Sequence, residues 1–478
     1  MAKTRHHMRS ITASTQINTY SPYGNNRNGE FPSSNSDPSA ANVNVSFGKN
    51  EKKNLTPYEK LLYDLQYDTH FKAEEKAGRL IGFYRLYKDI GLGNFSRVKL
   101  GVHLLAKEEV AIKILDKTKL DNKTQRLILR EITSMENLYH PNIIRLYEVI
   151  ETPNAIHIVT EYAPGGDLYT HITSEGKIPE DEAKHIFAQI TAAVDHMHSK
   201  NIIHRDIKSE NVFFVKEHLI KIGDFGFSTY SEKNQPLTTF CGSPPYAAPE
   251  LYRDENYIGI YVDIWAMGIT LFFMVTGLMP FRAENMGKLK KSIIDGHYSI
   301  PGSVSYQCQE LINGLLNHEI TERWSIKQIR SCSWLAHQNF PKEFNPFSMN
   351  INNYYTSSNV TKISTSIPTK SSIEYETYLR LQKLGITSEY LQVMNKNSDD
   401  KNFSNFDMIN GTYRILLHRL QKQSNVLERD DMYAEKFNED FPSLQNHMIT
   451  SYRRTGERKS KQNLNQSQTH NAKVCIIL

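Results

Sequence analysis

The chain has 478 residues, 39% of them hydrophobic and 23% charged, so it is long enough for two or three domains. Its net charge of +5 is small for this length, and no RNA-binding or arginine-aromatic motif occurs, which argues against nucleic-acid binding. The four cysteines are scattered, which indicates a reducing compartment. No apolar signal run opens the chain and no stretch reads as long enough to span a bilayer, so we expect a cytoplasmic protein.

The N-terminal region changes in composition near residue 55. Residues 1–55 are rich in Ser, Asn, Gly and Pro and contain too little apolar area to offset the entropy of ordering, which predicts disorder. Residues 56–82 are helix-permissive and predict a leader helix on the edge of the next domain. A regulatory role for this helix is the alternative.

Two glycines, Gly91 and Gly93, separate strand-like runs in the stretch IGFYRLYKDIGLGNFSRVKL. Glycine lets the backbone approach phosphate oxygens closely, although such a pair alone is more often an ordinary turn. A strand-like VAIK follows and contains Lys113, which would usually reach out to solvent. Glu131, on the next amphipathic stretch, is a candidate partner that would hold this lysine over phosphates.

The candidate catalytic and metal-binding residues lie in the stretch from residue 202 to 226, IIHRDIKSENVFFVKEHLIKIGDFG. It places Asp206, Lys208 and Asn211 within six residues, and Asp224 follows an apolar hairpin-like run. Carboxylate and amide oxygens are ligands that Mg²⁺ prefers beside phosphate and water. A further carboxylate can orient a hydroxyl and accept its proton.

These motifs, in this order and spacing, resemble the eukaryotic protein kinases over residues 83–336. The resemblance implies an α+β, two-lobed fold. It has a small, mostly antiparallel β N-lobe with one regulatory helix, and a larger helical C-lobe. It also implies ATP and Mg²⁺ as cofactors. Lys208 resembles the loop of serine/threonine kinases, because tyrosine kinases have a different, alanine- and arginine-containing loop.

The same resemblance implies a role for each site residue. Asp206 would accept the hydroxyl proton, Lys208 would stabilise the transferring phosphoryl group, and Asn211 with Asp224 would bind Mg²⁺. Binding of ATP would involve Ile90, Gly91, Leu92, Gly93, Asn94, Phe95, Ser96, Arg97, Val98, Ala111, Lys113, Glu131, Glu161, Ala163 and Asp167.

Two positions depart from the family pattern. Ser96 stands where a third glycine is usual, and Phe213 stands where Leu or Met usually lies beneath adenine. An aromatic residue there narrows the expected pocket. The alternative to an enzyme is a pseudokinase, a binding or scaffold module, although Lys113, Asp206 and the two metal ligands are all present.

The segment from Asp224 to Glu250 resembles a kinase activation segment, and Thr239 matches the activating threonine of the AMP-activated-kinase-related group. Thr238 is the neighbouring alternative. Several strings resemble the Nim-one branch of that group, which implies an upstream activating kinase and protein substrates with basic residues near the acceptor. Asp167 and Glu210 would receive those basic residues. Three structural roles are also expected: Ser243 beside Asp206 and Lys208, Asp263 bracing the catalytic loop, and Glu250 paired with Arg323.

The remaining chain divides into three parts. Residues 337–372 read as a polar linker, and 373–424 as a ubiquitin-associated-like helical module, with a plain helical bundle packed on the kinase as the alternative. Residues 425–478 form a basic tail that ends in Cys475-Ile-Ile-Leu, the form of a geranylgeranylation signal. Lipidation of Cys475 together with the basic tail would give peripheral membrane contact, although so short a motif also arises by chance.

Overall fold

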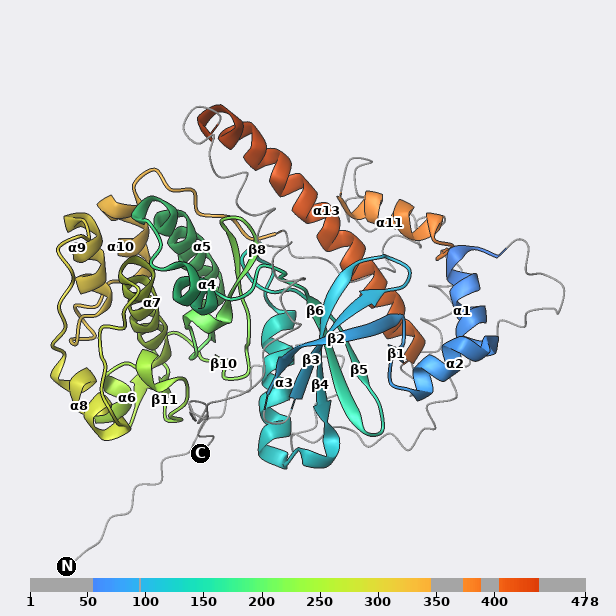
Figure 1. Ribbon diagram of the computed structural model, residues 1–478, viewed down its shortest axis with the longest axis horizontal. Coiled ribbons are helices and arrows are strands. Elements are labelled where there is room, and N and C mark those ends of the chain that lie inside the picture. Colours follow the sequence, from blue (N-terminus) through green and yellow to red (C-terminus); the bar gives the residue numbers. More distant parts are fainter. Residues whose placement is uncertain (1–54, 94–95, 345–372, 388–403, 438–478) are drawn as a thin grey trace, which may run out of the picture.

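The computed structural model describes residues 55–93, 96–344, 373–387 and 404–437. A small lobe built on an antiparallel sheet and a larger helical lobe are joined by the segment that follows residue 161 (Figure 1). This arrangement confirms the α+β, two-lobed fold that the sequence motifs imply. Residues 94–95, the first 54 residues and the last 41 lie outside the described part of the chain.

The small-lobe sheet has six strands, and the motif residues lie on its central strands. Its spatial order is β1 (Leu80–Ile81), β2 (Tyr84–Leu92), β3 (Ser96–His103), β4 (Glu109–Asp116), β6 (Ala155–Glu161) and β5 (Leu146–Glu151). The helix α3 (Asn122–Glu136) follows β4 and the short turn Lys117–Lys119. The side chain of Asp121 caps α3 by accepting a hydrogen bond from the Thr124 amide at 2.7 Å.

The large lobe consists mainly of helices around one apolar core. Its helices are α4 (Leu168–Glu175), α5 (Glu180–Ser199), α6 (Glu250–Arg253), α7 (Gly259–Thr276), α8 (Met286–Asp295), α9 (Tyr306–Leu315) and α10 (Ile326–Ser331). Short antiparallel pairs join β7 (Ile202–Ile203) with β10 (Thr229–Tyr230), β8 (Val212–Lys216) with β9 (Leu219–Ile222), and β11 (Pro236–Leu237) with β12 (Tyr257–Ile258).

Helix α7 is almost entirely apolar, with Asp263 as its single charged residue. Its 18 residues are long and apolar enough to cross a membrane by length and composition, which the sequence reading did not expect. In this structure 83% of that stretch is buried inside the large lobe, where it packs beside α5 and α9 (Figure 1). A helix that is apolar all round is typical of a protein core, and core packing accounts for the composition of α7.

The expected leader helix is two helices, α1 (Pro57–Tyr67) and α2 (Thr69–Lys76). The break falls at Asp68, whose side chain accepts hydrogen bonds from the amides of His70 at 2.7 Å and Phe71 at 3.2 Å. Because this side chain satisfies the free amides of a new first turn, α2 starts there. The chain then enters β1, so the end of the predicted leader segment belongs to the small-lobe sheet.

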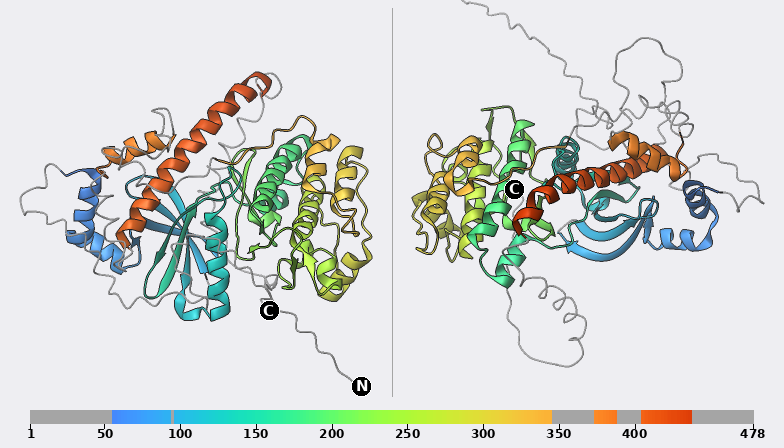
Figure 2. Two further views of the ribbon diagram at one scale, coloured as in Figure 1. Left: turned by 180° about the vertical axis from the view of Figure 1, so that it is seen from behind. Right: turned by 90° about the horizontal axis from the view of Figure 1, so that it is seen from above.

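The C-terminal helices α11 (Ile373–Lys383) and α13 (Ser404–Phe437) lie against the small lobe, and α13 runs beside β5 (Figures 1 and 2). Helix α13 continues beyond the predicted end of the module at residue 424. A second apolar cluster joins the sheet to these helices and to α1, and includes Tyr58, Leu61, Leu381, Ile409, Tyr413, Leu416 and Leu417. The ubiquitin-associated-like identity stays a prediction, while packing on the kinase lobe is observed.

At Gly411, α13 passes close to side chains of the small-lobe sheet. A Cβ built at this position would lie 2.2 Å from Glu148 Oε2 and 2.9 Å from the Tyr84 hydroxyl. Those two groups hydrogen-bond to each other at 2.6 Å and are buried. No side chain fits between them and the helix, so glycine at position 411 is a packing requirement of this interface.

His103 connects β3 to α13 in its neutral form. Its Nδ1 accepts a hydrogen bond from the Ala106 amide at 2.9 Å, and its Nε2 lies 3.2 Å from Thr412 Oγ1. The Thr412 hydroxyl donates to the Met408 carbonyl, so its oxygen is available to accept from Nε2–H. Burial, with the nearby charges of Arg419 and Lys107, lowers the pKa of His103 to about 3.

We expect the stability of this lobe to fall as the pH drops below the ordinary histidine pKa of 6.5. Between pH 6.5 and 3 the unfolded chain binds a proton at His103 that the folded chain excludes, so acid favours unfolding. At pH 5.5 the expected loss is about 1 kcal/mol from this residue. Urea unfolding of wild type and His103→Gln at pH 7.5 and 5.5 measures it, and the variant should show the smaller pH dependence.

His297→Gln is the matched control, because His297 is exposed. It should keep the pH dependence of the wild type. Equal pH dependence in wild type and His103→Gln would show that His103 does not exclude the proton.

Candidate functional site

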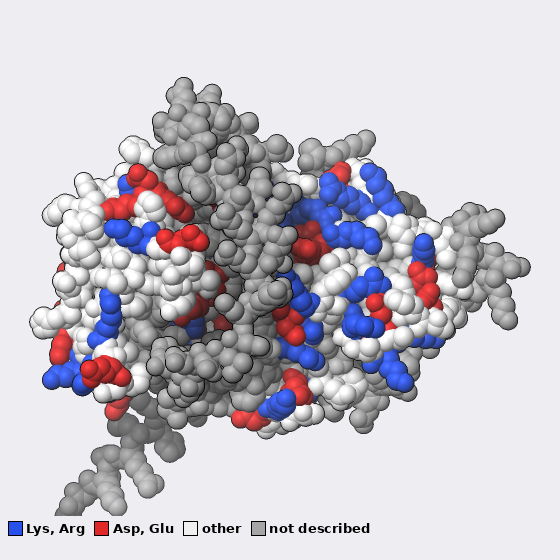
Figure 3. Space-filling view, viewed as in Figure 1, with Lys and Arg blue, Asp and Glu red and all other residues white. Residues whose placement is uncertain are grey.

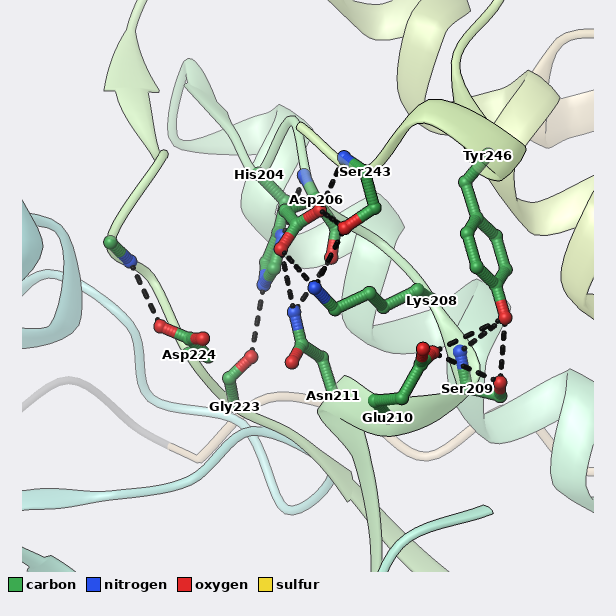
Figure 4. Close-up of polar contacts among 11 residues, drawn as sticks. His204, Asp206, Lys208, Ser209, Glu210, Asn211, Gly223, Asp224, Ser243 and Tyr246 are labelled. Carbon is green, nitrogen blue, oxygen red and sulfur yellow. Dashed lines mark hydrogen bonds and ion pairs between the residues drawn. The ribbon is translucent and has the colours of Figure 1, made fainter. Parts of the chain in front are cut away.

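Asp206 lies at the centre of a polar cluster in the cleft between the lobes (Figure 4). Its Oδ1 accepts hydrogen bonds from the Ser243 hydroxyl at 2.8 Å and the Ser243 amide at 2.9 Å. Its Oδ2 lies 2.8 Å from Lys208 Nζ, which also donates to Ser243 Oγ at 2.8 Å. The expected contacts of Ser243 are therefore present. Burial would lower the pKa of Lys208, but Asp206 and the neighbouring carboxylates raise it, so the ammonium stays charged.

Asn211 and Asp224 lie near Asp206 (Figure 4); Asn211 directly precedes β8, and Asp224 comes two residues after β9. The Asn211 amide nitrogen donates to the Asp206 carbonyl at 2.8 Å, which leaves the amide oxygen for a cation. The Asp224 carboxylate is open to solvent although it lies deep among protein atoms. Those atoms would raise its pKa, but the charges of Lys113 and Lys208 hold the pKa below its usual range.

Lys113 and Glu131 form the ion pair that the sequence predicts between β4 and α3. Lys113 Nζ lies 2.7 Å from Glu131 Oε1 and 3.0 Å from Oε2. Burial would lower the pKa of Lys113, but Glu131 and Asp224 raise it above its usual range. Phe225 is fully buried and packs on the His204 ring, with centroids 4.9 Å apart, which keeps Asp224 on the cleft side.

The backbone of the catalytic loop is held in a strained shape by Asp263 on α7. Arg205 has φ +64° and Asp224 has φ +59°, a region that side chains with a Cβ rarely adopt. Asp263 accepts hydrogen bonds from the amides of His204 at 3.0 Å and Arg205 at 2.8 Å. It also contacts His198 Nε2 at 2.9 Å. This network fixes Asp206, so the bracing role expected for Asp263 is observed.

Most of the predicted nucleotide residues lie on the small-lobe sheet and on the segment that leads out of it. β2 and β3 form a hairpin with Gly91 opposite Val98, and β4 pairs with β6 so that Ala111 faces Thr160. The chain then leaves β6 at Glu161 and passes Ala163 before Asp167, whose side chain caps α4 through the Thr170 amide at 2.8 Å. The described members of the predicted set lie on β2, β3, β4, α3 and β6 and on the short segments beside them: Ile90, Gly91, Leu92, Gly93, Ser96, Arg97, Val98, Ala111, Lys113, Glu131, Glu161, Ala163 and Asp167. Asn94 and Phe95 lie outside the described residues.

The donor set fits Mg²⁺ with a nucleotide. Asn211 and Asp224 offer one amide oxygen and one ionised carboxylate, which are hard ligands suited to a cation shared with phosphates. Lys113 and Lys208 would neutralise further phosphate charge from two sides. The residues present therefore suit both groups.

Thr239 is exposed and lies near Arg205. The Tyr257 hydroxyl donates to the Thr239 carbonyl at 2.7 Å and lies 3.3 Å from Arg205 Nη1. Arg205 is buried, and its Nε donates to the Phe227 carbonyl at 2.7 Å. One tyrosine thus brings the candidate phosphorylation site close to the arginine that precedes the catalytic aspartate.

Of the two candidate acceptors for basic substrate residues, Glu210 is exposed and Asp167 is half-buried. Glu210 Oε2 accepts hydrogen bonds from Ser209 Oγ at 3.2 Å and the Tyr246 hydroxyl at 3.3 Å, and these contacts hold it at the cleft (Figure 4). Glu210 lies within the catalytic loop, and Asp167 directly precedes α4.

A buried charge cluster behind the hinge is absent from the sequence predictions. Glu161 Oε2 lies 2.9 Å from Lys221 Nζ of β9, and Glu161 Oε1 lies 3.4 Å from Lys422 Nζ of α13. His418 of α13 hydrogen-bonds through Nδ1 to the Tyr147 hydroxyl at 2.9 Å. Burial would raise the pKa of Glu161, but the charges of Lys221 and Lys422 lower it to about 2.

The surface beside this cluster is basic. Figure 3 shows Lys and Arg atoms gathered over α11 and the described part of α13, with both signs mixed elsewhere on that face. A lone lysine in the apolar run LIKI was the one sequence signal for Lys221. The α13 partners have no local signal, because they are distant in sequence from the residues they contact. Cys475 and the basic tail lie outside the described residues.

Comparison with known proteins agrees with this geometry. The family model described as "Protein kinase domain" matches residues 84–335, just over half of the 478-residue chain. The chain is 41% identical over 274 residues to serine/threonine-protein kinase SIK2 of Gallus gallus, which covers 57% of this chain and 34% of the relative.

Two further relatives give similar values. Identity is 43% over 264 residues to serine/threonine-protein kinase SIK3 homolog of Danio rerio, covering 55% of this chain and 22% of the relative. Identity is 42% over 255 residues to serine/threonine-protein kinase SIK1 of Mus musculus, covering 53% of this chain and 33% of the relative. The chain therefore spans about a third or less of the length of these relatives. They fit the AMP-activated-kinase-related group, while closeness to the Nim-one branch stays a prediction.

Proposed function

Because the chain belongs to the protein kinase family, we propose that it is a serine/threonine kinase that transfers the γ-phosphoryl group of ATP to protein hydroxyls. One observation carries the proposal. Asp206, Lys208, Asn211 and Asp224 lie in one polar cluster, and the Lys113–Glu131 pair of the small lobe is close enough to Asp224 to interact with it electrostatically.

Each residue has a defined task in this proposal. Asp206 orients the acceptor hydroxyl and takes its proton, and Lys208 supplies positive charge where negative charge develops on the transferring group. Asn211 and Asp224 would hold Mg²⁺, which supplies charge neutralisation of the phosphates when bound. Lys113 positions the phosphates, and Glu131 keeps that lysine in place.

The rival reading is a pseudokinase that binds nucleotide without transferring phosphate. A thermal-shift titration with ATP, with and without Mg²⁺, beside phosphorylation of a degenerate serine/threonine peptide library, separates the two. Stabilisation by ATP and Mg²⁺ together with labelled peptide supports the enzyme. Stabilisation without peptide labelling, from protein phosphorylated at Thr239, supports the pseudokinase.

Phosphorylation at Thr239 is the proposed activation step. Arg205 lies near this threonine, so a phosphate there gains charge-assisted hydrogen bonds that order the activation segment. We expect phosphorylated wild type to exceed the unphosphorylated protein in kcat/KM by at least about tenfold. After treatment with an activating kinase, Thr239→Ala should stay at the low rate.

Thr238→Ala is the matched control, because this neighbour is equally exposed. It should still be activated. If Thr238→Ala loses activation and Thr239→Ala keeps it, the assignment moves to Thr238.

The proposed partners are an upstream kinase and protein substrates with basic residues near the acceptor, which Glu210 and Asp167 would receive. Peptides with arginine before the acceptor should lose their advantage in Glu210→Gln. Geranylgeranylation of Cys475 and membrane contact stay predictions. An unmodified Cys475 followed by an intact Leu478 in the mass spectrum of cell-derived protein would remove both.

A further inference from the structure

Phe213 lies on β8, between the hinge and the proposed metal ligands. It is two residues from Asn211 in sequence, pairs with Lys221 of β9 and forms an isolated bridge with Asp167. The next residue ties the strand to the hinge loop, because the Gly165 amide donates to the Phe214 carbonyl and the Phe214 amide donates to the Gly166 carbonyl, each at 2.8 Å. The backbone under this ring is therefore held from both sides.

The Phe213 side chain is half-buried and packs against the edge of the large-lobe core. Val98 on β3 and Ala111 on β4, two neighbouring strands of the small lobe, are also half-buried. Under the proposed function, the resemblance to the protein kinases puts this ring beneath the adenine base of the nucleotide.

Gly223, directly before Asp224, is buried against this ring. A Cβ built on it would lie 3.1 Å from Phe213 Cε2, 3.4 Å from Phe213 Cδ2 and 3.1 Å from Ile144 Cγ1. The two 3.1 Å distances, to Phe213 Cε2 and Ile144 Cγ1, are shorter than ordinary van der Waals contact. A methyl group at this position would have to displace the ring or the isoleucine.

The backbone conformation at position 223 does not require glycine, because Gly223 is not among the described residues with positive φ. The backbone also cannot retreat from the ring. The Gly223 amide donates to the Asn211 carbonyl at 2.9 Å, and its carbonyl lies 3.2 Å from His204 Nε2. Packing against Phe213 and Ile144, rather than local conformation, is what excludes a side chain here.

We propose that Phe213 and Gly223 are a size-matched pair that sets the floor of the adenine site and hence the affinity for nucleotide. The missing Cβ at 223 provides the room that an aromatic ring at 213 takes. This inference rests on the proposed kinase function, because it concerns the nucleotide site of that enzyme. It assigns a specificity-determining role to Gly223, which contacts no phosphate or metal.

The displacement has a defined direction. Phe213 is enclosed on the side of Gly223 and Ile144 and open toward the cleft, so an added methyl group moves the ring into the base site. Core packing tolerates such insertions poorly, since the neighbours are close-packed. A smaller residue at 213 removes the conflict, so the effect of a methyl group at 223 should depend on the residue at 213.

The test is a double-mutant cycle in the full chain, with isothermal titration of ATP in the presence of Mg²⁺ as the readout. We expect Gly223→Ala to weaken ATP binding by about tenfold, because the displaced Phe213 ring no longer fits against the base. Phe213→Leu should bind within about threefold of wild type, and the double variant should bind within about threefold of Phe213→Leu. In peptide assays Gly223→Ala should raise the KM for ATP and leave kcat nearly unchanged.

Gly302→Ala is the matched control, because a Cβ at Gly302 has nothing within 4 Å. It should bind ATP as wild type does, and the unfolding temperature of each nucleotide-free variant checks its fold. Should Gly223→Ala fail to fold, a folded double variant with near-normal affinity still supports the pair, and a double variant that also fails to fold overturns it.

Two binding results would overturn the inference: wild-type affinity in Gly223→Ala, or a double variant as weak as Gly223→Ala alone. Failure of the proposed function looks different. A chain that binds ATP but labels no peptide contradicts the kinase assignment and leaves the binding cycle interpretable. A wild-type chain that does not bind ATP overturns both.

Discussion

Replacing Asp206 with asparagine is expected to lower kcat by about 10²–10⁴-fold, the range of a lost general base. Asparagine keeps the size of the side chain and one oxygen that can accept from Ser243, but it removes the charge that faces Lys208 at 2.8 Å and the basic group that takes a proton. Steady-state phosphorylation of an arginine-containing peptide at saturating ATP measures the change.

Folding and nucleotide binding should survive the Asp206→Asn substitution, because Asp263 and not Asp206 holds the loop backbone. Lys113→Met is the companion variant and should weaken ATP binding as well, since Lys113 faces the phosphate site. More than a tenth of wild-type turnover in purified Asp206→Asn would contradict the assigned role.

Replacing Arg323 with methionine is expected to destabilise the large lobe by about 3–5 kcal/mol, because it leaves the Glu250 carboxylate buried without its partner. Both side chains are fully buried, and Arg323 Nη1 and Nη2 donate to the two Glu250 oxygens at 2.7 and 3.0 Å. The expected ion pair is thus present and bidentate. For a domain of this size the loss corresponds to a fall in unfolding temperature on the order of 10 °C.

Lys288→Met is the matched control, because it breaks an exposed pair, Lys288 with Glu284, and should change stability by less than about 1 kcal/mol. Adding Glu250→Gln to Arg323→Met should recover part of the loss, since no unpaired charge then stays buried. Equal effects of Arg323→Met and Lys288→Met would show that burial does not govern this pair.

Residues within short motifs could be placed from the sequence. Asp206, Lys208 and Asn211 lie within six residues of one another, so local chain geometry alone brings them together. The Lys113–Glu131 pair was also predictable, because one strand and the next helix carry it. The leader helix was only partly right, since the cap at Asp68 divides it in two.

The contacts that sequence reasoning missed join residues far apart in the chain. Glu161 meets Lys422 across 261 positions, and neither residue belongs to a motif. Gly223 was missed for a related reason. Its lack of a side chain matters only beside Phe213, and that proximity depends on how β8 pairs with β9. Pairwise fit of this kind follows from packing rather than from any local pattern.

The helix α13 has a practical consequence for choosing fragments to express. The family match ends at residue 335, but the small lobe buries Ile409, Tyr413 and Leu416 of that later helix in its own apolar cluster. Each such side chain contributes about 1.5–3 kcal/mol when removed from water. A truncation after the matched region would expose the apolar side chains of the small lobe that α13 covers, and we expect such a fragment to self-associate. A fragment for expression should therefore extend from α1 at least through residue 424.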